Sequence, residues 1–174
     1  MKSKIHEIQN TIRIGMSKKT FLLVALIATL LGQQTFAQDS TKAVPSSLLV
    51  SYYNLKDALV SSNANTAAVS AAAFINAING TDKEIIKEES RTTLLSDATT
   101  ISQTKDVKLQ REKFATLSAN LLVLAKTVKL TTEPVYLQYC PMKKASWLSN
   151  NKAIKNPYYG SAMLTCGSIK ETLH

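Results

Sequence analysis

Apolar side chains recur at intervals of three and four residues over 46–61, the spacing that gathers them on one face of a helix. That face consists of Leu48, Tyr52, Leu55 and Leu59. A second, alanine-rich helix is predicted from a cap at Asn63 or Asn65 to an end at Gly80, where glycine interrupts the pattern. Its small side chains allow a neighbouring helix to approach closely.

Two further helices follow. Thr81-Asp82-Lys83-Glu84 has the spacing of a capping box, which predicts that the third helix begins there. Asp106 begins a fourth helix over 106–129. The apolar face expected for the third helix consists of Leu94, Ala98 and Ile101. The apolar face expected for the fourth helix consists of Val107, Phe114, Leu117, Leu121, Leu124 and Val128. Four amphipathic helices with short connections predict a mainly α fold, an antiparallel four-helix up-down bundle.

The pattern changes over 131–174. Glu133-Pro134 ends the helical periodicity, 135–139 is rich in strand-forming residues, and 156–160 has the composition of a turn. This segment is expected to form an irregular cap or a short β-hairpin that packs on the bundle.

The first 37 residues have the pattern of a secretory signal peptide. Lys18 and Lys19 precede an apolar stretch of 11 residues, which is shorter than the roughly 20 residues that span a bilayer as a helix. Cleavage is expected near Ala37-Gln38, and no cysteine follows it, so a lipoprotein is not expected. The sequence therefore predicts an exported, periplasmic protein without stable membrane insertion after signal removal.

Three segments are expected on this basis. They are the signal peptide 1–37, whose first 15 residues precede a better start at Met16, a flexible leader 38–46, and a single helical domain 47–174.

Loss of five cations and one anion with the signal lowers the net charge from +9 to +5. The lysines alternate with acidic residues, which favours a solvated helical surface over nucleic-acid binding.

Sulfur is confined to two short motifs after the signal, Cys140-Pro141-Met142 and Met163-Leu164-Thr165-Cys166. Thiolates and thioethers are soft ligands that prefer ions such as Cu(I) or Ag(I). The candidate metal ligands are Cys140, Met142, Met163 and Cys166. Trp147 is a candidate for a cation–π contact with the ion, with a buried anchor as the alternative.

The same cysteines support a second interpretation. In an oxidising compartment Cys140 and Cys166 would form a disulfide that closes a loop of about 26 residues. The protein would then be an envelope interaction module without a metal, with Tyr158 and Tyr159 as candidate contact residues. Spacing alone leaves both interpretations open.

Enzymatic activity is not expected. After the signal, His174 is the only histidine, which removes most acid–base and triad arrangements. The three remaining glycines form no phosphate-binding loop.

Several motifs together resemble domain of unknown function 3347. They are the segment 52–59, Leu117-Ser118, Tyr139-Cys140-Pro141-Met142, Trp147-Leu148, the segment 156–160, and Met163-Leu164-Thr165-Cys166-Gly167. Members of that family are small exported proteins and C-terminal extensions of heavy-metal efflux adaptor subunits. The resemblance implies a periplasmic setting, handling of copper or silver, and a heavy-metal efflux adaptor or another envelope protein as partner.

Overall fold

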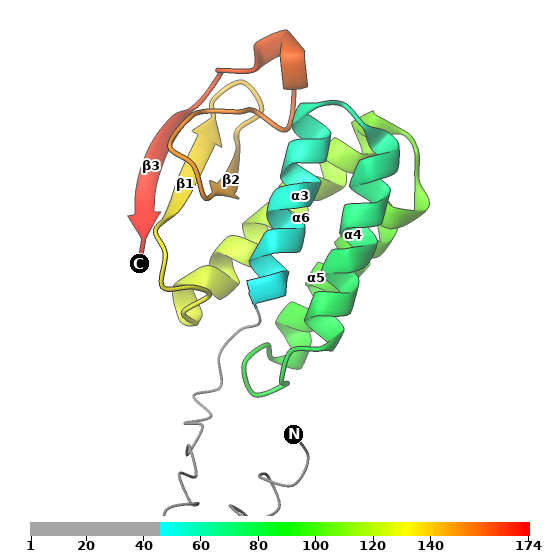
Figure 1. Ribbon diagram of the computed structural model, residues 1–174, viewed down its shortest axis with the longest axis vertical. Coiled ribbons are helices and arrows are strands. Elements are labelled where there is room, and N and C mark those ends of the chain that lie inside the picture. Colours follow the sequence, from blue (N-terminus) through cyan, green and yellow to red (C-terminus); the bar gives the residue numbers. More distant parts are fainter. Residues whose placement is uncertain (1–45) are drawn as a thin grey trace, which may run out of the picture. The chain divides into compact units, whose positions relative to one another are not determined.

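Four helices form most of the computed structural model, which describes residues 46–174 (Figure 1). They are α3 (Ser46–Val60), α4 (Ala64–Asn79), α5 (Glu88–Gln103) and α6 (Val107–Thr127). Each helix packs against the next, and they run alternately up and down (Figure 1). The predicted helical bundle is therefore confirmed. The predicted signal peptide, its cleavage site and the leader as far as residue 45 lie outside the described residues.

A small antiparallel sheet follows the bundle. It contains β1 (Val135–Cys140), β2 (Ala145–Ser149) and β3 (Ser168–Leu173) in the order β2-β1-β3, with a short 3-10 helix, η1 (Gly160–Met163), before β3. The predicted β-containing cap is confirmed, and β1 corresponds to the strand-forming segment 135–139, whereas the sequence pattern placed neither β2 nor β3. The register of the pairing between β1 and β3 shifts between Leu137 and Gln138 of β1. The shift arises because β3 carries one extra residue, Lys170, at this point.

The apolar stripes predicted from the helical period form the core. All four members of the α3 face have no exposed surface, and Leu94, Ala98 and Ile101 of α5 are equally buried. On α6 the central members of the stripe are buried, whereas Val107 and Val128 at its ends are partly buried. The bundle is thus held by the apolar interior expected for an up-down arrangement. No helix within residues 46–174 has both the length and the apolar character needed to cross a bilayer.

Tyr52 joins the bundle to the sheet. Its ring stacks on Phe114 of α6, with centroids 5.3 Å apart, and its hydroxyl hydrogen-bonds to Ser118 at 2.8 Å. The same hydroxyl accepts the amide of Leu148 in β2 at 3.1 Å. Burial raises the pKa of Tyr52 well above its ordinary range, so the neutral, donating form is retained. The Tyr52 side chain therefore holds α3, α6 and β2 together.

The third helix begins later than predicted. Thr81 does not cap it: its hydroxyl donates to the Ala77 carbonyl and so closes the end of α4. Asp82 accepts the Glu84 amide in a tight turn, and the helix begins at Glu88. The capping-box prediction is wrong because the turn allows Ile86 to be fully buried in the core.

Arg91 stabilises this turn and is a structural residue that the sequence pattern did not reveal. Only 5% of it is exposed, and its guanidinium donates to the carbonyls of Ile78, Thr81 and Ile86. The end of a helix leaves carbonyls without partners. Arg91 supplies donors for the Ile78 carbonyl in the last turn of α4 and for the Thr81 and Ile86 carbonyls in the connection to α5.

Of the two predicted caps for α4, Asn63 is the one used, and Asp106, predicted as the start of the fourth helix, is the N-cap of α6. The Asn63 side chain accepts the Thr66 amide at 3.0 Å. Asp106 accepts the amide of Lys108 at 2.9 Å and that of Leu109 at 3.4 Å. Both satisfy amides that have no partner within their helices.

Replacement of Asp106 by alanine is expected to lower the free energy of unfolding by about 1 kcal/mol, because α6 loses its capping oxygen. Urea unfolding followed by circular dichroism measures the change. Asp106→Asn keeps the acceptor and should remain within about 0.5 kcal/mol of the native protein. Equal losses in the two variants would show that charge rather than capping stabilises this end.

Candidate sulfur site

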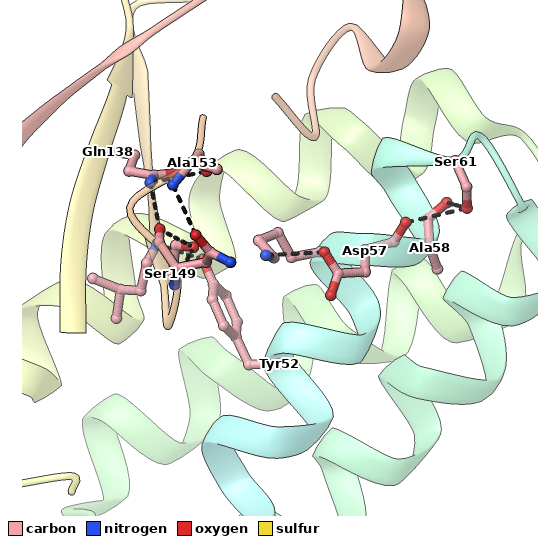
Figure 2. A network of polar contacts seen from close by, with 10 residues as sticks. Tyr52, Asp57, Ala58, Ser61, Gln138, Ser149 and Ala153 are labelled. Atoms are coloured by element: carbon pink, nitrogen blue, oxygen red, sulfur yellow. Dashed lines mark hydrogen bonds and ion pairs between the residues drawn. The ribbon is translucent and has the colours of Figure 1, made fainter. Parts of the chain in front are cut away.

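The hairpin positions the first sulfur motif. Cys140 is the last residue of β1 and lies opposite Ala145 of β2, and the connecting turn includes Lys144 with a left-handed φ of 54°. Alternation along β1 places Cys140 on the same face as Gln138, whose amide donates to the Asn151 carbonyl at 2.8 Å. This face is covered by the segment 150–167, as Gln138 and Ala153 in Figure 2 illustrate.

Asn156 organises the covering segment. It has no exposed surface, and its side-chain amide donates to the Cys166 carbonyl at 2.7 Å. Its side-chain oxygen accepts the amides of Tyr158 at 2.8 Å and Tyr159 at 3.3 Å. The sequence indicated only a turn here, yet this asparagine fixes the backbone of the second cysteine.

Gly160 and Arg111 hold the covering segment to the helices. The Arg111 guanidinium donates to the carbonyls of Leu59 and Pro157 and to the Ser62 hydroxyl, each at 2.9 Å. Gly160 has a φ of +58°, and a Cβ there would lie 2.6 Å from an Arg111 nitrogen. Glycine is required because the backbone is left-handed and pressed against that side chain.

The fold brings the two cysteines into contact. Their Sγ atoms are 3.6 Å apart, and both thiols are free. The amide of Lys143 donates to Cys140 Sγ at 3.4 Å. Residues separated by 25 others in the chain thus share one small site. The distance is longer than the 2.03–2.05 Å of a disulfide bond, so the bridge of the alternative interpretation is not formed in this structure.

The two thiols differ in their electrostatic surroundings. Burial acts to raise the pKa of Cys140, but hydrogen bonds donated by the Lys143 amide and the Asn156 side chain outweigh it, so this pKa lies below its ordinary value. The hydrogen bond toward Cys140 raises the pKa of Cys166. Cys140 is therefore the preferred position for the first thiolate, with Cys166 as its donor.

The two methionines lie in the turns that carry the cysteines. The Met142 amide lies near both sulfurs, and its side chain is 63% exposed. Met163 is 40% exposed, and its carbonyl accepts the Cys166 amide at 3.1 Å. Within residues 46–174 no three His, Cys, Asp or Glu side chains gather to hold a metal ion. A metal bound here would depend on sulfur.

Trp147 is part of the core. Its indole is 1% exposed and meets the ring of Tyr158 edge-on, with centroids 5.8 Å apart. A Cβ added to Gly167 would lie 2.9 Å from this indole. Trp147 therefore supports the backbone next to Cys166 as a buried anchor, the alternative to the cation–π contact.

Tyr158 is not an exposed contact residue, and the prediction that placed it on an interaction surface is wrong. It is 5% exposed, packs between Trp147 and Phe114, and donates its hydroxyl hydrogen to the Ser146 carbonyl. Burial raises its pKa well above the ordinary value. Tyr159 is partly buried against the core. The aromatic pair was misinterpreted because the covering segment turns these rings inward.

Comparison with known proteins gives one result for this chain. The model of the family described as "Protein of unknown function (DUF3347)" matches residues 48–133, which supports the resemblance to that family over the helical segment. The four sulfur-bearing residues lie beyond the matched part. No curated protein and no solved structure matches the chain.

Proposed function

Because the helical segment matches this domain family and the cap holds two cysteines in contact, we propose that the protein binds a soft monovalent metal ion, Cu(I) or Ag(I). Cys140 and Cys166 are the thiolate ligands, and Met142 and Met163 are the thioether candidates. The observation that supports this most directly is the 3.6 Å separation of the two sulfurs. For comparison, two thiolates of a tetrahedral zinc site, each about 2.3 Å from the ion, lie about 3.8 Å apart, so the two sulfurs are already at a distance that a shared metal ion can bridge.

The surroundings favour an anionic sulfur centre. Two thiolates and one monovalent cation carry a net negative charge, which amide donors such as that of Lys143 stabilise. The chain between 135 and 173 adds a basic field, since it contains five lysines and one glutamate. The lysines are Lys143, Lys144, Lys152, Lys155 and Lys170.

The same proposal includes a role in the cell envelope. The signal-like pattern of 1–37 and the family resemblance support export to the periplasm and a link to heavy-metal handling, with an efflux adaptor or another envelope protein as partner. Exposed methionines beside the cysteines suit transfer of an ion, because a flexible thioether can contact it before the thiolates bind it.

Titration of the reduced protein with Cu(I) in the presence of a competing chelator is expected to show one bound ion per chain and sulfur-to-metal charge-transfer absorption. Cys140→Ser should weaken binding by more than about tenfold, because a hard hydroxyl replaces a thiolate. Met142→Leu is the matched control that keeps both thiols and most of the side-chain volume, and it should weaken binding less. Unchanged absorption and affinity in Cys140→Ser would exclude the site.

A further inference from the structure

The two cysteines differ in their access to solvent. Cys140 has no exposed surface, whereas Cys166 is partly exposed. A small molecule that carries a disulfide bond can therefore reach the sulfur of Cys166 and not that of Cys140. Such asymmetry is what a stepwise thiol reaction requires: one sulfur to meet the reagent and a protected one to complete the exchange.

The geometry places the protected sulfur ready for the second step. Cys140 Sγ is 3.6 Å from Cys166 Sγ, close to the separation of reacting atoms in a near-attack arrangement. Pairing of Tyr139 with Ser168 and the hydrogen bond from Asn156 to the Cys166 carbonyl hold the two backbone segments side by side. A bond of about 2.05 Å would require the sulfurs to approach by only about 1.5 Å.

We propose that this pair carries out thiol–disulfide exchange with small-molecule disulfides, with Cys166 as the entry thiol and Cys140 as the resolving thiol. The proton that the two sulfurs share passes to Cys140. The Cys166 thiolate so formed attacks one sulfur of the reagent, forms a mixed disulfide and releases the first thiolate. Cys140 then attacks Cys166 Sγ, which forms the internal disulfide and expels the second thiolate. The two protein thiols are oxidised, one external disulfide is reduced to two thiols, and the two protons pass to those products.

This activity goes beyond the proposed metal binding, and it does not require it. One consequence does rest on the proposed function: the internal disulfide and a bound ion use the same sulfurs, so each excludes the other. Exchange with a disulfide would then release the ion, and reduction would restore the site.

Oxidised glutathione is the probe for the test, added to the reduced, metal-free, full-length protein and quenched with acid at intervals before intact-mass analysis. The native protein is expected to lose two hydrogens through a transient adduct. Cys140→Ser should accumulate a stable glutathione adduct on Cys166, identified by peptide mapping. Cys166→Ser should react at least about tenfold more slowly than the native protein, because its remaining thiol is buried.

Three results would overturn the inference. They are a Cys166→Ser variant that reacts as fast as the native protein, a Cys140→Ser variant without an adduct, and a native protein that keeps its adduct without closing the bridge. Near-ultraviolet circular dichroism of the buried Trp147 checks that the variants are folded. Cys166→Ala and Cys140→Ala provide a second pair of variants for the same assay. Cys166→Ser unfolded in urea should regain reactivity, which shows that burial protects its thiol.

The metal titration is kept separate from this assay. Loss of exchange with normal Cu(I) binding would overturn the inference and leave the proposed function standing. Normal exchange in a protein that binds no Cu(I) would overturn the proposed function and leave the inference standing.

Discussion

Replacement of Trp147 by alanine is expected to lower the free energy of unfolding by about 3–5 kcal/mol, the range typical of large aromatic side chains removed from a core. The indole is 1% exposed and packs edge-on against Tyr158. Its removal leaves a cavity between the sheet and the covering segment, which cannot collapse while Asn156 and Arg111 hold that segment in place. Urea unfolding followed by far-ultraviolet circular dichroism measures the loss, because the sequence has no other tryptophan to report by fluorescence.

Trp147→Phe is the matched control. It keeps an aromatic ring in the same place and should cost clearly less than the alanine variant. The alanine variant should also loosen the backbone at Gly167, because the indole lies against that residue, and so weaken metal binding at the neighbouring Cys166. A loss of stability below about 1 kcal/mol would show that Trp147 is not an anchor of this cap.

The second large effect is expected at Arg91. Arg91→Ala should destabilise the protein by about 3 kcal/mol, because the buried carbonyls of Ile78 and Thr81 lose their charged donor and cannot reach water. Charged hydrogen bonds to carbonyls are worth about 1.5–3 kcal/mol each when one partner is removed. Chemical unfolding at fixed pH measures the change.

Arg91→Lys tests whether the shape of the guanidinium matters. Lysine keeps the positive charge but has a single nitrogen and cannot reproduce the forked contacts, so it should recover only part of the loss. Thr92→Ala, on the exposed surface beside Arg91, should remain within about 0.5 kcal/mol of the native protein. Full recovery by lysine would mean that charge alone stabilises the end of α4.

Most of the helical part could be predicted from the sequence, because the bundle depends on periodic burial. Leu48, Tyr52, Leu55 and Leu59 repeat with the helical period, and one buried interior is the consequence. The start of α5 could not be predicted in this way. The signal at Thr81 is local, whereas the outcome depends on Arg91, ten residues away, and on the demand to bury Ile86.

The strand β3 escaped prediction for a similar reason. Its residues are exposed or partly exposed, and an edge strand of this kind has no buried face that would impose an alternating pattern. Its pairing with β1 is decided by long-range contacts, such as that between Tyr139 and Ser168. The amino-acid composition of this segment therefore says little about which strand it pairs with.

The candidate site was predictable in its chemistry and not in its geometry. Cys140 and Cys166 were identifiable as the only cysteines of the chain, but the contact between their sulfurs follows from the fold. Asn156, which fixes the backbone at Cys166, resembles any turn asparagine in the sequence. Tyr158 was misjudged because its burial depends on how the covering segment lies over the sheet.

The extra residue in β3 also affects how copies of this protein behave toward one another. β3 lies at the margin of the sheet, where an uninterrupted strand would offer a regular row of amides and carbonyls to another chain. Lys170 breaks that regularity, and Glu171 beside it pairs with Lys126 at 3.0 Å. An incoming strand would find its hydrogen-bonding groups out of phase and would meet charge. The irregularity therefore makes edge-to-edge pairing of two copies through β3 less favourable than an uninterrupted strand would.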